Sequence, residues 1–258
     1  MGSYISYLLS SEKKICKYGW RPDSPDYRDY TYEISPPLHT LPTQVDLRPN
    51  CPGIYNQLYV GSSTSNTICA LYEYKLIELD EESVFIPSRL FLYYNERCHQ
   101  DTSEYDSGSQ LRIGLSNLNT YGVCAETDYP YDIRNTFMEP DEEIYTIANA
   151  ARRIKYYRVA RDLDSLRTLI SRGEPFIFGF SVYSNFHIDM PSLTTPGTYD
   201  SYVGGHCGMC VGFDDSKKVF IIRNSWGLEW GNNGYFEMSY DYIVNQGLCV
   251  DFWIIKLV

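Results

Sequence analysis

The sequence has no apolar run of the roughly 20 residues that a helix needs to cross a bilayer. The apolar stretch at residues 4–9 is short, and no basic residues precede it as they would in a secretory signal. We therefore expect a cytoplasmic protein with no membrane partner.

Positive charge is scarce as well. Lys and Arg number 22 against 33 Asp and Glu, which gives a formal net charge of −11. This balance disfavours a general affinity for nucleic acid or for an anionic membrane surface, because both attract cationic proteins. We expect no nucleic-acid partner.

The eight cysteines do not form a recognisable metal or disulfide framework. Cys207 and Cys210 make a CxxC beside His206, but the sequence offers no second CxxC or paired histidine to complete four zinc ligands. The apolar residues around them favour a core strand, and a chain of this length can fold without disulfide bonds. We expect free thiols, no metal and no cofactor.

The organisation of the chain changes near Leu41. Residues 1–40 have few aliphatic side chains and prolines at 22, 25, 36 and 37, which predicts an extended N-terminal arm. Residues 41–258 form one domain, with a helical part over about 41–131 and a β-rich part over about 132–258. Helices followed by strands indicate an α+β fold.

Apolar residues recur at three- and four-residue spacing in the first part. They predict helices that run from Ser63 to Leu79, with four candidate N-caps at residues 62–65, and over residues 88–97 and 109–121, the last ended by Gly122. In the second part we expect a charged crossing segment and one helix, 163–171. Short apolar or alternating segments then predict strands over residues 176–182, 206–213, 219–222, 234–239 and 252–256.

A histidine and an asparagine lie on adjacent predicted strands. His206 begins one strand and Asn224 ends the next, and the hairpin at residues 214–218 brings the two together. A histidine that acts as a base needs a partner on its other ring nitrogen, and a neutral amide oxygen can fill that role. We expect Trp226, two residues later, to shield this hydrogen bond from water.

A second group of residues surrounds the start of the helix at Ser63. A nucleophile at a helix N-terminus is favoured because the helix dipole stabilises its anion and free N–H groups can bind an oxyanion. Gln57, six residues earlier, can supply a second oxyanion donor. Each residue alone has a commoner structural explanation: Ser63 as an N-cap, Gln57 as a loop residue and Asn224 as a turn residue.

Taken together, the order Gln57, Ser63, His206, Asn224 and the segment NSWGLEWGNNGY at residues 224–235 resemble the papain-like cysteine peptidases. The resemblance covers about residues 41–258. Its further motifs are VDLR at 45–48, YNQ at 55–57, DSGS at 106–109 and the stretch 118–131.

The resemblance implies a two-lobed fold, with a helical lobe, an antiparallel β-barrel-like lobe and the active site in the cleft between them. It implies an endopeptidase that binds an extended peptide or protein substrate and forms a covalent acyl-enzyme. Val250 or Asp251 is expected near the floor of the pocket for the second residue before the scissile bond. The implied substrate-binding residues are Gly61, Gly108, Ser109, Gly179, Gly204, Gly205 and Trp226.

Position 63 departs from the family, which has cysteine there. A hydroxyl has a pKa far above the roughly 8.5 of a thiol, so it cannot form the resting ion pair with His206. We expect peptide binding to persist and most turnover to be lost. Cys69 is a poor substitute, because six residues along a helix it lies nearly two turns away.

Two interpretations of Ser63 stay open. The retained Gln57, His206 and Asn224 favour a cysteine peptidase whose nucleophile was changed from cysteine to serine, to stop self-cleavage or to trap a peptide. The alternative is a natural serine-bearing protein, either a weak hydrolase or a pseudoenzyme that binds extended peptides without turnover. A transglutaminase-like or ester-hydrolysing variant would share the same residues.

The arm carries two short motifs of its own, at residues 19–23 and 28–30. They look like the short leader of microbial and viral-type members of the family, not the long helical propeptide of lysosomal cathepsins. A virion-associated location is therefore a second expectation. The arm is either a removable propeptide in the cleft or a permanent strap on the surface.

Overall fold

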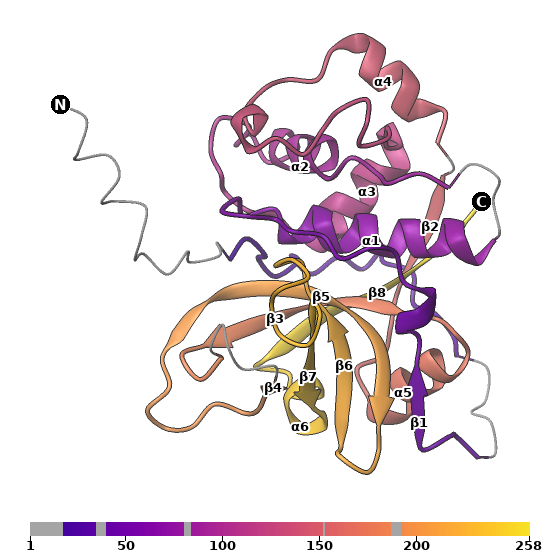
Figure 1. Ribbon diagram of the computed structural model, residues 1–258, viewed down its shortest axis with the longest axis vertical. Coiled ribbons are helices and arrows are strands. Elements are labelled where there is room, and N and C mark those ends of the chain that lie inside the picture. Colours follow the sequence, from indigo (N-terminus) through magenta and orange to yellow (C-terminus); the bar gives the residue numbers. More distant parts are fainter. Residues whose placement is uncertain (1–17, 35–39, 80–83, 152, 187–191) are drawn as a thin grey trace.

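Helix α1 (Ser63–Glu78) lies at the centre of the molecule, between the helices of the upper lobe and a large sheet (Figure 1). Every residue from Ser63 to Leu76 is buried, as expected for a helix that is covered on all sides. The structure is a computed structural model and describes residues 18–34, 40–79, 84–151, 153–186 and 192–258.

The remaining helices of the upper lobe are α2 (Arg89–Cys98), α3 (Leu111–Tyr121) and α4 (Glu142–Asn149). The Oγ of Ser88 caps α2 by accepting the Phe91 N–H at 3.2 Å. Gly122 ends α3 with φ 76° and ψ −157°, a backbone conformation that glycine adopts without strain. Helices α1 to α3 are confirmed. No helix in the described ranges is long and apolar enough to cross a membrane.

The second lobe is an eight-stranded sheet with the order β2-β8-β3-β5-β6-β7-β4, and β1 pairs with β5 beside this path. All pairings are antiparallel except β4 with β7. The strands are β1 (Gln44–Asp46), β2 (Ile154–Arg158), β3 (Phe176–Tyr183), β4 (Ser192–Leu193), β5 (Tyr202–Asp214), β6 (Val219–Arg223), β7 (Tyr235–Ser239) and β8 (Cys249–Leu257).

The five predicted strands are present as β3 and β5 to β8, and the predicted helix is present as α5 (Leu163–Ser171). Strands β1, β2 and β4, the helices α4 and α6 (Tyr240–Ile243) and the short turns η1 (Arg48–Asn50) and η2 (Ile133–Asn135) were not predicted. These elements are short, so neither helical nor alternating spacing extends over enough residues to identify them.

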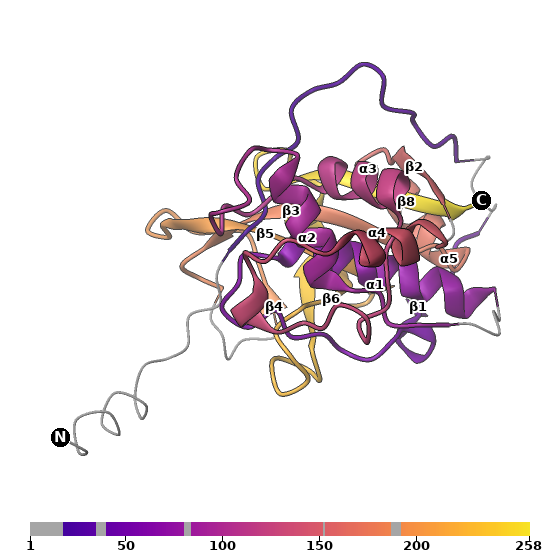
Figure 2. The same cartoon turned by 90° about the horizontal axis from the view of Figure 1, so that it is seen from above.

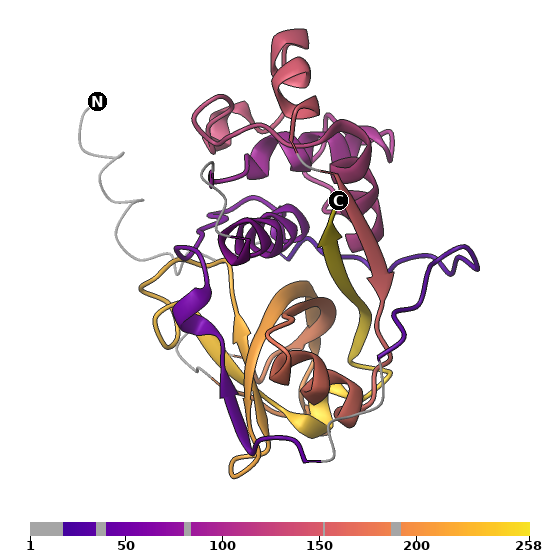
Figure 3. The ribbon, with the colours of Figure 1, turned by 90° about the vertical axis from the view of Figure 1, so that its right-hand side faces the viewer.

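The boundary between the lobes along the chain also differs from the expected division at about residue 131. Strand β1 belongs to the sheet although it lies in the segment expected to be helical, and α4 packs on α3 although it follows residue 131. Figure 3 shows β2 and β8 side by side, with the C-terminus next to β2 at the level of the helices. Which lobe a short element joins is decided by tertiary packing, which the sequence pattern does not record.

Phenylalanine side chains fill the sheet side of the core. Phe178 stacks on Phe252 with 5.2 Å between ring centroids and 8° between ring planes, and Phe176 packs against both. Close packing of these rings fixes β3 against β8. It thereby holds β5, the neighbouring strand on the other side of β3, in a defined position.

The described part of the arm runs along the boundary between the lobes. It makes single parallel bridges from Trp20 to Ser109 and from Thr31 to Arg158. Figure 2 shows the arm in indigo, passing β3 and α3 before it arches away from the body. The extended conformation predicted for the arm is therefore present over residues 18–34.

Candidate active site

The hydrogen bond between His206 and Asn224 defines one side of the site. His206 lies on β5, Asn224 follows β6, and Nε2–H of His206 donates to Oδ1 of Asn224 at 2.8 Å. The contact expected from the hairpin is therefore present. Because Oδ1 can only accept, the neutral ring carries its proton on Nε2 and leaves Nδ1 unprotonated. Within the described residues, Nδ1 has no hydrogen-bond partner.

Aromatic rings enclose His206. The Trp226 ring stacks on the imidazole, with 4.8 Å between centroids and 26° between planes. Phe180 and Tyr18 meet the imidazole edge-on, with centroids 5.4 and 6.1 Å away. Burial lowers the pKa of His206 from 6.5 to about 4, and the hydrogen bond to Asn224 offsets only part of this shift. The ring is therefore neutral at physiological pH.

Ser63 is the first residue of α1 and is fully buried. Its Oγ has no hydrogen-bond partner among the described groups. Ser62 holds the N-cap position, but its side chain does not cap the helix, because its hydroxyl bonds the phenol of Tyr131 at 2.5 Å. The N–H groups of the first turn therefore keep the partial positive charge that favours an anion.

Gln57 is held in place by Ser225, the residue after Asn224. The Ser225 hydroxyl donates to Oε1 of Gln57 at 2.6 Å, and the Gln57 N–H donates to the Ser225 carbonyl at 2.8 Å. The Nε2 of Gln57 donates to the carbonyl of Val60 at 3.0 Å, three residues before Ser63. One amide is thus oriented from the β6 side toward the start of α1. Ser225 was not identified from the sequence, where it is one of many serines.

A buried carboxyl group lies behind the start of α1. The hydroxyl of Thr64, next to Ser63, donates to Oε2 of Glu96 at 2.5 Å, and Glu96 is fully buried on α2. Burial raises the pKa of Glu96 to about 8. A glutamate in an amphipathic helix is normally predicted to face solvent, so this contact could not be predicted from the amino-acid pattern.

The cysteine thiols near the site are poor nucleophiles. Cys207 lies beside Ser63, and its Sγ is 3.5 Å from the hydroxyl of Thr67. Burial raises the pKa of Cys207 to about 12 and that of Cys69 well above its usual value. Neither thiol is ionised near neutral pH. Over the described ranges the cysteines are free, and no group of three or more His, Cys, Asp or Glu side chains is placed to hold a metal.

Comparison with known proteins gives consistent matches. A family model described as papain family cysteine protease matches residues 96–250, more than half of the chain and including His206 and Asn224. The chain is 38% identical over 209 residues to a peptidase C1-like protein of Acanthamoeba polyphaga mimivirus, covering 76% of this chain and 67% of that protein. This chain belongs to the papain family of cysteine proteases.

Solved structures agree with this assignment. Xylellain, a cysteine protease from Xylella fastidiosa, is 39% identical and matches with a TM-score of 0.86 over 96% of this chain and 98% of that chain. Digestive procathepsin L 3 of the Tenebrio molitor larval midgut is 20% identical and has a TM-score of 0.66, covering 90% of this chain and 74% of that chain. This second likeness shows the fold alone. The predicted two-lobed α+β papain-like fold is confirmed.

The arm occupies the groove where the papain family was expected to bind a peptide backbone. The Ser109 N–H donates to the Gly19 carbonyl at 2.7 Å, and the Arg21 N–H donates to the Ser109 carbonyl at 2.8 Å. On the opposite wall, the Trp20 N–H donates to the Gly205 carbonyl at 3.0 Å. Three backbone hydrogen bonds thus hold residues 19–21 between the two lobes.

The glycines around this groove allow the arm to approach closely. An ideally placed Cβ would lie 1.9 Å from the Trp20 ring at Gly179, and 2.0 Å from the Gly19 carbonyl oxygen at Gly108. A side chain at either position would exclude the arm. All seven predicted substrate-binding residues adjoin arm residues 18–21: Gly61, Gly108, Ser109, Gly179, Gly204, Gly205 and Trp226.

The carboxylate of Asp251, expected near the pocket floor, is already bound by other groups and is not free to pair with a substrate side chain. It accepts the Asp23 N–H at 2.7 Å and pairs with Arg158 at 2.9 Å. Val250, the other residue expected there, is the pairing partner of Gly179 across β8 and β3. The indole N–H of Trp20, buried in this pocket, has no acceptor among the described residues. The pocket therefore suits an uncharged side chain.

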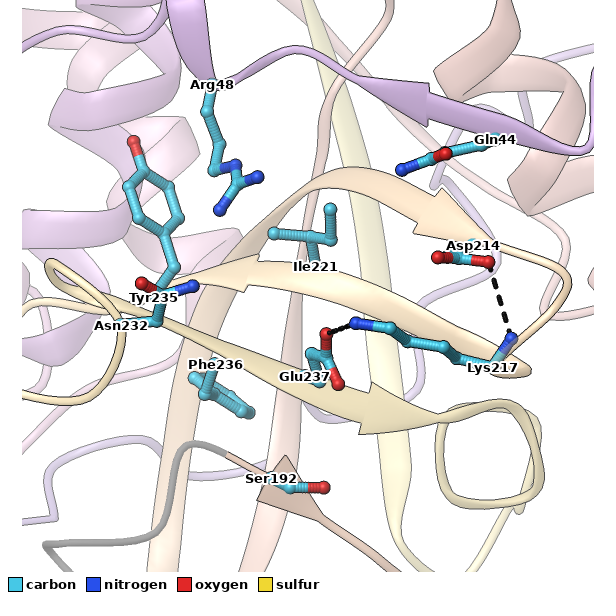
Figure 4. Close-up of a pocket in the computed structure, with 10 residues that line it drawn as sticks. All are labelled: Gln44, Arg48, Ser192, Asp214, Lys217, Ile221, Asn232, Tyr235, Phe236 and Glu237. Carbon is cyan, nitrogen blue, oxygen red and sulfur yellow. Dashed lines mark hydrogen bonds and ion pairs between the residues drawn. The ribbon is translucent and has the colours of Figure 1, made fainter.

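A separate hollow of about 320 Å³ lies on the outer face of the sheet (Figure 4). Its charged residues are already paired: Lys217 contacts Glu237 at 2.8 Å, its N–H donates to Asp214 at 3.3 Å, and Arg48 binds Asp46. Since no charge is left unpaired there, we assign this hollow no part in the site.

The His206–Asn224 pair predicts how the imidazole responds to charge. Replacing Asn224 with aspartate (Asn224→Asp) puts a carboxylate beside Nε2–H, which favours the imidazolium and should raise the pKa of His206 from about 4 by one unit or more. NMR titration of the imidazole protons measures this pKa in both proteins. An unchanged pKa would mean that Asn224 does not control the ring.

Proposed function

We propose that this chain has the site of a cysteine peptidase with serine at the nucleophile position, so that it binds extended peptides but does not hydrolyse them at the rate of a peptidase. One observation carries the proposal. Ser63 Oγ and His206 Nδ1 are both buried without hydrogen-bond partners, although Asn224 and Gln57 are firmly held around them. In a thiol-peptidase reaction the nucleophile at the first position gives its proton to the base at the second.

The same arrangement supports peptide hydrolysis when residue 63 carries a thiol. Nδ1 of His206 takes the thiol proton, and the thiolate attacks the substrate carbonyl carbon. In this proposal the oxyanion is stabilised by the N–H of residue 63 and by the second hydrogen of Gln57 Nε2, whose first hydrogen is donated to Val60. The imidazolium then gives its proton to the leaving amine, and water releases the acyl group from sulfur with Nδ1 again acting as base.

A hydroxyl at position 63 does not complete this sequence efficiently. Serine has a much higher pKa than the roughly 8.5 of a thiol, and His206, with a pKa of about 4, is a weak base. A carboxylate partner would strengthen the base, but the partner here is the neutral amide of Asn224. The proton transfer that activates the nucleophile is therefore strongly unfavourable.

We propose further that the arm covers the cleft in a direction that resists cleavage. The leaving amine must lie near His206, because the imidazolium protonates it, so the leaving-group side is where Tyr18 and Trp226 lie. A substrate chain therefore runs from Ser109 toward Trp226. The arm runs the opposite way, from Tyr18 to Arg21, and presents its peptide bonds in reverse.

The first test restores the thiol. We expect Ser63→Cys to raise peptide hydrolysis by on the order of 10³-fold or more over the serine form, because loss of the nucleophile removes most catalysis in comparable enzymes. An alkylating epoxide should abolish this activity and label residue 63, as identified by mass spectrometry. Ser63→Ala is the matched control and should be as inactive as the parent chain.

A second outcome separates the alternatives. If Ser63→Cys binds peptides but neither hydrolyses them nor reacts with the epoxide, the natural peptide-binding pseudoenzyme is correct and the peptidase proposal is wrong.

The arm gives a further prediction. Trp20 is buried in the pocket beside Gly179 and holds the arm there. Burying a tryptophan contributes several kcal/mol. We therefore expect Trp20→Ala, in the Ser63→Cys background, to speed alkylation of residue 63 at least about tenfold. Tyr27→Ala is the control, because Tyr27 is 98% exposed. Equal labelling rates would show that the arm does not block the site, and loss of the arm near Leu41 on incubation would identify it as a propeptide.

A further inference from the structure

Beyond the catalytic cleft, the arm inserts an aspartate into a charged cluster. The side chain of Asp23 is completely buried. It accepts the Trp253 indole N–H at 3.0 Å and the Arg112 backbone N–H at 3.1 Å, and it pairs with Arg158 at 3.1 Å. A carboxylate with three donors around it is bound in a formed site, not merely close to a surface.

A second arm aspartate completes the cluster. Asp29 accepts from Nε of Arg112 at 2.8 Å and from Nε of Arg158 at 2.9 Å. Arg158 also pairs with Asp251 at 2.9 Å and lies over the Trp253 ring, with 4.1 Å between its guanidinium carbon and the ring centroid. Arg158 thus contacts carboxylates from both the arm and β8.

The part of the arm around these aspartates makes little apolar contact. Tyr27 and Tyr30 are 98% and 75% exposed. A hollow of about 860 Å³ lies between the arm and residues of α3 and β2. Apolar burial therefore does not explain why this part of the arm is held, whereas the charged contacts of Asp23 and Asp29 do.

We infer that Arg112, Arg158 and Trp253 form a carboxylate-binding site, outside the catalytic cleft, that anchors the arm through Asp23 and Asp29. Its ligand class is an acidic peptide segment with two carboxylates. The arm supplies two of the three carboxylates in the cluster, and Asp251 of β8 is the third. Arg112 and Arg158 also pair with Asp29 and Asp251, so the buried Asp23 is the third acidic group of the cluster and is bound most favourably when it carries a proton.

Binding of the arm in this cluster, here called seating, depends on pH, because three carboxyl groups share two guanidinium groups. Burial and the neighbouring Asp251 raise the pKa of Asp23 from 3.8 to about 6, against the opposing effect of Arg112 and Arg158. In the released arm the pKa of Asp23 is near its ordinary 3.8, so Asp23 binds a proton more tightly when the arm is in place. Seating is therefore strengthened as the pH falls through about 6, by about tenfold between pH 7.5 and pH 5.

Hydrogen–deuterium exchange of the full chain tests this inference without requiring peptide hydrolysis, so its outcome is independent of the proposed function. The amides of Trp20 and Arg21 report seating, because they donate to Gly205 and Ser109. Corrected for intrinsic exchange, their protection should be about tenfold greater at pH 5 than at pH 7.5.

Two variants and a control sharpen the test. Asp23→Asn keeps the acceptor oxygen but cannot ionise, so protection should stay high and lose its pH dependence. Arg158→Met should lower protection at both pH values. Asp26→Asn, which changes an arm carboxylate whose ion pair is with exposed Arg28 and on which Arg112 has the smallest of the electrostatic effects, should behave nearly like the parent chain.

The inference is overturned if protection is equal at the two pH values or rises with pH, or if Asp23→Asn and Asp26→Asn have the same pH dependence. Should Arg158→Met fail to fold, as judged by thermal unfolding, the comparison of the two aspartate variants still decides the matter.

Discussion

The site depends on the N-terminus of α1 being buried against β5. This packing brings Ser63, at the start of the helix, to the strand that carries His206, and it leaves the first helical N–H groups without a side-chain cap. The β5–β6 hairpin then sets Asn224 on the far nitrogen of the imidazole. Burial of α1 on all sides therefore fixes the position of residue 63 as well as stabilising the fold, because a shift of this helix would separate the nucleophile from its base.

Much of this arrangement could be predicted from the sequence, because it rests on local patterns. Apolar spacing located α1 to α3, and the hairpin between His206 and Asn224 followed from two short strands and a polar turn. Ser225, Glu96 and Cys207 could not be placed, since their importance arises only when distant segments meet. The same holds for β1 and α4, whose membership of a lobe is decided by packing partners far along the chain.

The arm changes how the low basicity of His206 is understood. Tyr18 is one of the rings that bury the imidazole, and the desolvation that lowers its pKa is thus partly a property of the covered cleft. Release of the arm would expose the ring to water and raise that pKa. The charged cluster around Arg158 and the aromatic enclosure of His206 are therefore linked through a single extended segment.

The most direct test of the central claim is the ionisation of a thiol at position 63. The ultraviolet absorbance of the thiolate, measured against pH in a Ser63→Cys, Trp20→Ala chain and corrected with the Trp20→Ala chain, reports the pKa of that thiol alone. The helix N-terminus and His206 should lower this pKa well below the usual roughly 8.5. A pKa at or above 8.5 would contradict the account, because the site would then not be built to activate sulfur.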